Sequence, residues 1–182
     1  MKLTGSIVSL FAAAVMCAGV KADDKIEATD KPSLPPELKV FQRWIGSWSY
    51  ESTICKSEWT PEEKHAAGKF TCAWTMGGRY LEERGTDGED GSHMRLTTFD
   101  ATRQAYRAWW FSSTGISNES TGSWDDAAKT FSWTAKIENG RTVASRQHFV
   151  SDDVVEASVR VTDSTGKEFF HAEYKSTRQA VR

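Results

Sequence analysis

The sequence predicts an all-β protein: a barrel of about ten antiparallel strands in up-and-down order, preceded by one short helix. After Gly46, apolar and polar residues alternate with a period of two almost to the end of the chain. Turn sequences interrupt this alternation about every ten residues, and a single stretch with helical spacing stands before Gly46. A closed barrel is favoured over a sandwich because closure leaves no exposed strand edge.

Residues 1–22 have the layout of a secretory signal peptide. The stretch from Ile7 to Val20 is almost wholly apolar or small, and Lys2 precedes it. Val20 and Ala22 place small residues at the two positions that a signal peptidase reads. The apolar run is shorter than the roughly 20 residues of a membrane span. We therefore expect an exported protein, periplasmic or secreted after cleavage near Ala22, with an uncleaved anchor as the alternative.

The rest of the chain divides into a leader and one domain. Residues 23–36 are charged and proline-containing, which is typical of a flexible leader, and residues 37–182 form the predicted barrel domain. Without Lys2 and Lys21 the chain keeps 21 of its 23 basic residues against 25 acidic ones, a formal charge of −4. It has no long block of like charge, so we expect neither a nucleic-acid partner nor an anionic membrane surface.

The predicted helix covers residues 37–45. Leu38, Phe41, Trp44 and Ile45 fall on one helical face, and Gly46 ends the helix. A helix of this length does not persist alone in water, so its apolar face must pack against the barrel.

The strands are separated by recognisable turns. They are predicted at 48–55, 70–76, 80–86, 93–99, 105–112, 131–138, 141–150, 154–162 and 168–177, with one more leading into Trp124-Asp125. Segments 99–106 and 124–131 are similar: each predicts a hairpin whose aspartate bonds the turn backbone while its end aromatics meet across the strands. Asn139-Gly140 is the strongest short hairpin signal.

Two cysteines remain after signal cleavage, because Cys17 leaves with residues 1–22. An even pair in an oxidising compartment allows a disulfide between Cys55 and Cys72. The alternation, however, places Cys55 opposite the Trp48 face of its strand and Cys72 on the same face as Phe70. A disulfide and two separate free thiols both remain open.

Four groups of residues, in this order, resemble a bacterial lipocalin-like family of uncharacterised, often exported proteins in the calycin superfamily. They are Gly46-x-Trp48, Met76-Gly-Gly-Arg-Tyr-Leu-Glu-Glu83, Phe99-Asp100…Tyr106…Trp110 and Tyr174…Arg178. The resemblance covers essentially the whole domain after the leader. It implies a calycin-type barrel with the helix at one end.

The resemblance also implies roles for individual residues. Trp48 would lie across the closed end of the barrel and stack with Arg178 as a cation–π pair, which is a structural role. Tyr106 and Trp110 would point inward. We expect these two residues and Trp74 to form the wall of a ligand pocket, because large aromatics suit a barrel interior.

Polar residues on the strands are candidates to orient a ligand: Glu83, Arg146 and His148. Arg146 and His148 share one face of their strand, as do His171 and Glu173 on the last strand. The sequence leaves open whether these rows face the interior or the solvent.

Metal and cofactor chemistry finds little support in the sequence. The four histidines His65, His93, His148 and His171 show no metal-ligand spacing, so we expect no metal site and no cofactor. Nitrobindins, which are also calycins, bind haem through one histidine late in the barrel, and His171 lies late here. Haem at His171 is therefore an alternative, although the chain lacks the longer glycine-rich opening of nitrobindins.

Catalytic motifs are also missing. No Gly-x-Ser-x-Gly elbow occurs, and the adjacent Glu82 and Glu83 point to opposite faces of a strand. The leading hypothesis is a non-catalytic, exported protein that binds a small apolar molecule inside the barrel. A hydrolase or isomerase on the same barrel, with acid and base groups in its interior, is one alternative. A barrel filled by its own side chains is the other.

Overall fold

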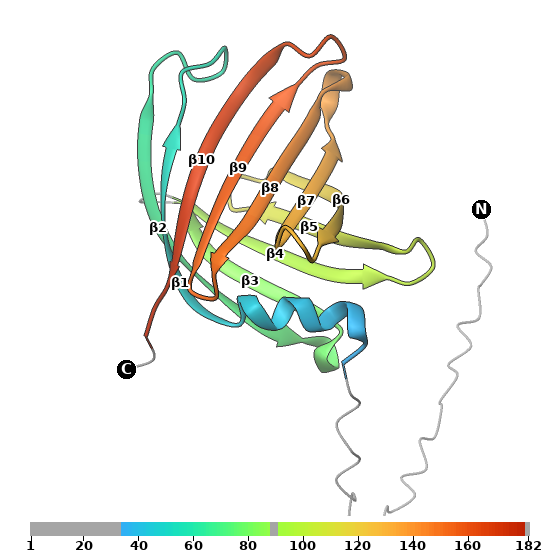
Figure 1. The fold of residues 1–182 in the computed structure, drawn as a ribbon. Helices are drawn as coiled ribbons and strands as arrows, with labels where there is room; N and C mark the ends of the chain where they lie inside the picture. The colour runs from blue at the N-terminus through green and yellow to red at the C-terminus, as the bar shows by residue number, and fades with distance from the viewer. Residues whose placement is uncertain (1–33, 88–90, 181–182) are drawn as a thin grey trace, which may run out of the picture. The chain divides into compact units, whose positions relative to one another are not determined.

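The computed structural model describes residues 34–87 and 91–180, which form a closed antiparallel barrel of ten strands with a helix across one end (Figure 1). The 3₁₀ helix η1 spans Pro36–Trp44. The strands are β1 (Gly46–Ile54), β2 (Lys64–Thr75), β3 (Tyr80–Asp87), β4 (Gly91–Asp100), β5 (Ala105–Ser112), β6 (Ser117–Asp125), β7 (Thr130–Lys136), β8 (Thr142–Ser151), β9 (Val154–Thr162) and β10 (Glu168–Arg178). Short 3₁₀ turns, η2 (Met76–Gly78) and η3 (Glu138–Gly140), join β2 to β3 and β7 to β8.

Each strand pairs with its neighbours in sequence, and β1 pairs with β10 to close the barrel. The predicted ten-stranded antiparallel barrel is thus confirmed. The largest difference in boundaries is at β2, which begins at Lys64 rather than near Phe70. All nine residues of β1 are paired with β2, ending in Ile54 opposite Lys64, so β2 must extend this far.

The two similar hairpins form as predicted. The Asp100 carboxylate accepts hydrogen bonds from the backbone of Thr102 and Arg103, and the Asp125 carboxylate accepts one from Ala128. The ring centroids of Phe99 and Tyr106 lie 5.1 Å apart across the first hairpin, and those of Trp124 and Phe131 lie 4.7 Å apart across the second. These pairs fix the register, because a slip by one residue would turn each ring to the other face.

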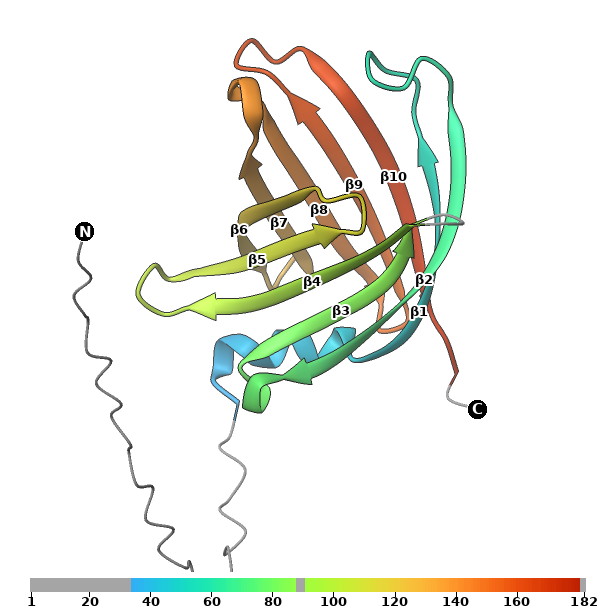
Figure 2. The ribbon, with the colours of Figure 1, turned by 180° about the vertical axis from the view of Figure 1, so that it is seen from behind.

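The helix lies across one end of the barrel (Figure 2), and its apolar side chains Leu38, Phe41 and Trp44 are buried there. Phe41 is buried, and its ring centroid lies 5.4 Å from that of Tyr106 and 5.5 Å from that of Phe131. Trp44 makes an edge contact with Phe149 at 4.9 Å. Burial of these rings stabilises a helix too short to persist alone.

Trp48 forms the floor under this helix. It is 0% exposed, its indole donates a hydrogen bond to the Trp44 carbonyl at 2.8 Å, and its ring stacks on Phe70. The Arg178 guanidinium lies 4.3 Å from the Trp48 ring centroid, the arrangement that the resemblance implied. A side chain at Gly46 would approach Arg178 to 3.1 Å, and the φ of Gly46 is +125°, so glycine suits this position.

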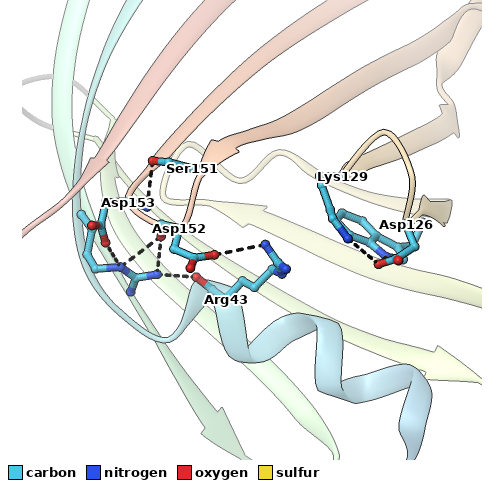
Figure 3. A network of polar contacts seen from close by, with 8 residues as sticks. Arg43, Asp126, Lys129, Ser151, Asp152 and Asp153 are labelled. Atoms are coloured by element: carbon cyan, nitrogen blue, oxygen red, sulfur yellow. Dashed lines mark hydrogen bonds and ion pairs between the residues drawn. The ribbon is translucent and has the colours of Figure 1, made fainter.

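Arg178 also joins the two sides of the floor. Its guanidinium donates to the carbonyls of Ile45, Arg43 and Asp152 and to the Asp153 carboxylate. Figure 3 shows Arg43, at the end of the helix, reaching the Asp152 carboxylate in the β8–β9 turn at 3.1 Å. The helix is therefore held to the barrel by polar contacts as well as by its rings.

Cys55 and Cys72, the two cysteines in the described part of the chain, are free and far apart. Cys72 lies opposite Gly46 in the β1–β2 ladder, whereas Cys55 follows Ile54 at the far end of β1. At about 3.3 Å per residue this separates them by roughly 30 Å, well beyond the reach of a disulfide. Burial, followed by the nearby Glu83 charge, raises the pKa of Cys72, so its thiol stays protonated and unreactive.

The predicted signal peptide and almost all of the predicted leader lie outside the described residues, and both remain expectations. Within residues 34–87 and 91–180, no helix has the length and apolar character required to cross a bilayer.

Candidate functional site

The barrel encloses a cavity of about 660 Å³, lined by side chains from all ten strands and by Trp44 of the helix. This volume lies in the range of small-molecule sites, about 300–1,000 Å³. An interior filled by the protein's own side chains is therefore ruled out.

One part of the cavity wall is aliphatic. Its residues are small or branched and come from β1, β2, β8 and β9: Ile54, Ala66, Val143, Val155, Ala157 and Val159. Hydroxyl and amide groups are set among them: Ser52, Asn118, Ser120, Ser145, Gln147 and Ser176. Some of these are already bonded within the protein; for example, Gln147 accepts a hydrogen bond from the Trp133 indole at 3.0 Å.

A hydrogen bond joins Glu83 and His93 in the cavity wall. Nε2 of His93 lies 3.1 Å from Oε1 of Glu83, and the two side chains are 8% and 19% exposed, in that order. Burial alone would raise the pKa of Glu83, but the hydrogen bond to His93 and the positive charge of Arg95 outweigh it and lower the pKa. Glu83 is thus a carboxylate at neutral pH.

Arg95 lines the cavity beside this pair. It stands directly opposite Glu83 in the β3–β4 ladder, yet Glu83 pairs with His93 instead. The Arg95 guanidinium lies over the Trp133 ring, 4.6 Å from its centroid. Burial lowers the pKa of Arg95 and the Glu83 charge opposes this, but a guanidinium keeps its proton in proteins.

Two glycines provide space for rings around these charges. A Cβ at Gly85 would lie 2.5 Å from Cε1 of His93, and one at Gly122 would lie 2.3 Å from the Trp133 ring. Both contacts are shorter than atoms tolerate, so any larger residue would displace the ring that it faces. Glycine at these two positions allows His93 and Trp133 to lie flat against the neighbouring strand.

The three predicted aromatic wall residues all lie inside the barrel, but at different depths. Trp110 lines the cavity, with its ring 6.4 Å from that of His93. Tyr106 belongs to the packed end, where its hydroxyl donates to the Glu37 carbonyl at 2.9 Å. Trp74 also packs at the helix, its indole donating to Gln42 at 3.2 Å. Of the three, Trp110 is the one in contact with the cavity.

The predicted polar anchors Arg146 and His148 do not reach the cavity. Both are exposed on the outer face of β8, because Gln147 and Phe149 of that strand point inward. Glu83, the third polar candidate, does line the cavity.

Sequence reasoning missed His93 and Arg95 as cavity residues. A signal for them exists: if Phe99 meets an inward Tyr106 across the hairpin, every second residue back along the strand, including Arg95 and His93, faces inward too.

His171 does not suit a haem ligand in this barrel. Ala172 and Tyr174 point inward on β10, so His171, one residue before Ala172, lies on the outer face of the strand, and its Nε2 is 2.8 Å from Oε1 of Glu173. The residues present therefore do not fit the group. Elsewhere in the described part of the chain, no cluster of three or more histidine, cysteine or acidic side chains is arranged to hold a metal ion.

Comparison with solved structures supports the fold. The chain is similar to the S-type phycobiliprotein lyase CPES from Guillardia theta, with 11% identity, 84% of this chain and 97% of that chain covered, and a TM-score of 0.52. It is also similar to a protein of unknown function from the DUF3598 family of Nostoc punctiforme PCC 73102, with 8% identity and a TM-score of 0.52. That match covers 76% of this chain, which spans 49% of the Nostoc protein. At such identities the likeness concerns the lipocalin-like barrel alone.

Comparison with curated proteins gave no match. The family model described as protein of unknown function (DUF1579) matches residues 35–178, from the start of η1 to Arg178 at the end of β10. The matched segment includes the floor, the cavity wall and all ten strands. The chain therefore belongs to the DUF1579 family of proteins of unknown function.

Proposed function

We propose that this protein binds a small, mainly apolar molecule non-covalently inside its barrel. The observation that carries the proposal is the cavity of about 660 Å³, walled by Val143, Val155 and Val159 together with tryptophan rings. An apolar molecule gains free energy there by leaving water, at about 25 cal/mol for each Å² that it buries. The cavity wall stands on strands closed into a barrel, so the site is largely formed before a ligand arrives.

The neutral dye N-phenyl-1-naphthylamine provides the test, because its fluorescence rises in an apolar site. We expect saturable binding to the wild-type protein. Ala157→Trp places a large ring inside the cavity from β9 and should weaken saturable binding, whereas Glu156→Trp, one residue away on the exposed outer face, should leave it unchanged. Equal binding by the two variants would place the dye on the surface and refute the proposal.

Export is part of the same proposal. It is supported by the apolar run of residues 7–20 and the small residues before Asp23. Expression of the full chain in a bacterial host should yield periplasmic protein whose N-terminal residue is near Asp23. Intact mass measurement checks this, and a full-length chain retained in the membrane fraction would favour the uncleaved anchor.

Catalysis on the same barrel is a second candidate function, favoured by the buried Glu83–His93 pair in the cavity wall. A carboxylate that bonds an imidazole orients it for proton transfer, as in hydrolases. Hydrolysis of 4-nitrophenyl esters that is lost in both His93→Gln and Glu83→Gln would support this function. Rates equal to the uncatalysed reaction in the wild-type protein would remove it.

A further inference from the structure

The Arg95 guanidinium has hydrogen-bonding capacity that the protein does not use. Its five N–H donors find no acceptor among residues 34–87 and 91–180, and the guanidinium lies over the face of the Trp133 ring. The guanidinium is half-buried and borders the cavity, so its donors are open to whatever occupies that space. A ligand in the cavity can supply the acceptor that the described residues do not.

Neighbouring residues fix the position of the Arg95 guanidinium. Trp133, over which Arg95 lies, is fixed by its hydrogen bond to Gln147 and by the space that Gly122 leaves for its ring. Arg95 pairs in the ladder with Glu83 on one side and Trp110 on the other. A guanidinium stacked on a ring has its N–H donors in its own plane, parallel to the ring. This arrangement of donors matches two oxygens of a carboxylate or sulfonate.

The charges in the cavity favour a ligand with a single negative charge. A cation would need Glu83, but His93 already bonds that carboxylate. A doubly charged anion would be repelled by Glu83, which lies beside Arg95 on the next strand. A single negative charge at Arg95 balances the guanidinium and leaves the Glu83–His93 pair intact.

We propose that the ligand is a monoanionic amphiphile, an aromatic or aliphatic acid whose carboxylate or sulfonate binds Arg95 while its apolar body lies against Trp110 and the aliphatic wall. This inference rests on the proposed binding function and specifies the chemical class of the ligand.

Two matched dyes test it: 1-anilinonaphthalene-8-sulfonate carries one negative charge, and N-phenyl-1-naphthylamine has the same body without it. We expect the ratio of the neutral dye's Kd to the anionic dye's Kd to fall about tenfold in Arg95→Met, which corresponds to about 1.4 kcal/mol. Arg84→Met, on the exposed face of β3, should leave the ratio unchanged. Glu83→Gln should raise it, because a repelling charge is removed.

The outcomes separate this inference from the proposed function. If neither dye binds the wild-type cavity, the proposed function fails. If both bind but Arg95→Met changes both Kd values by the same factor, Arg95 is structural and the inference is overturned. Opposite changes of the ratio in Arg95→Met and Glu83→Gln support it, since a loss of folding would weaken both dyes in both variants.

Discussion

Four arginines lie over tryptophan rings in the described residues, and two of them, Arg178 and Arg95, differ in their surroundings. At the closed end, Arg178 lies 4.3 Å from the Trp48 ring centroid and donates to three carbonyls and one carboxylate. In the cavity, Arg95 lies 4.6 Å from the Trp133 centroid and finds no acceptor in the described part of the chain. The same pair of residue types thus closes the fold in one place and leaves a charge available in the other.

The closed end and the cavity also differ in the size of the side chains that point inward, which are larger at the closed end. Along β1, buried Trp48 at the floor gives way to Ser52 in the cavity wall, and along β8 Phe149 gives way to Ser145. The inward face is continuous in each strand, so alternation alone does not distinguish packed core from cavity. The order of large and small residues along the strands decides where the space lies.

The largest expected effect is at the floor. Trp48→Ala removes a side chain that is 0% exposed and leaves a cavity beneath the helix, so it should lower the free energy of unfolding by about 3–5 kcal/mol. Trp110→Ala, in the cavity wall, should cost clearly less because its ring already borders open space. Urea unfolding of both variants measures this. Equal losses of unfolding free energy would contradict the distinction between the packed floor and the cavity wall.

The next largest expected effect is the difference in stability loss between substitutions of the two arginines. Arg178→Met leaves the carbonyls of Ile45 and Arg43 without donors and should cost about 2–4 kcal/mol. Arg95→Met breaks no hydrogen bond within the described residues and should lie within about 1 kcal/mol of wild type, or stabilise the protein. Urea midpoints with unchanged slopes give both numbers. A larger loss for Arg95→Met would show that Arg95 serves the fold.

Gly122→Ala should have an intermediate effect of about 1–3 kcal/mol, because its Cβ would meet the Trp133 ring. The displaced ring also moves the support of Arg95, so the anionic dye should bind more weakly. Ser120→Ala, the neighbouring inward position on β6, is the control and should change stability by less than about 1 kcal/mol. An unaltered melting temperature in Gly122→Ala would contradict this close contact.

The smallest expected effect is a pH dependence at Glu83. Its pKa is lower in the folded protein than in the unfolded chain, so the folded state binds fewer protons around pH 4. The stabilisation is present above the unfolded pKa of about 4.3 and is lost as the pH falls through the folded value. The difference in free energy of unfolding between wild type and Glu83→Gln should therefore shrink from pH 7 to pH 3. A constant difference would mean that the carboxylate does not contribute in this way.

Sequence patterns predicted the architecture because they are local. The aspartate turns after Phe99 and Trp124 and the Asn139-Gly140 hairpin depend on neighbouring residues, and each forms. The floor followed from the resemblance, which implied the position of Arg178 over Trp48.

The site was harder to predict because it depends on which row of each strand faces inward. On β8 the apolar Val143 and Phe149 mark the inward row, which excludes Arg146 and His148. Glu83 pairs with His93 rather than Arg95 because of distances in the folded structure. The spacing of these residues along the sequence does not predict this. The number of strands could be predicted from the sequence, but an Arg95 guanidinium without an acceptor among the described residues could not.

The most direct measurement is native mass spectrometry of the protein with 1-anilinonaphthalene-8-sulfonate. We predict one dye per chain in the wild-type protein and in Glu156→Trp, and clearly lower occupancy in Ala157→Trp, whose ring projects into the cavity. The same occupancy in Ala157→Trp as in the wild-type protein would show that the dye does not enter the barrel, and would contradict the claim that the interior is a binding site.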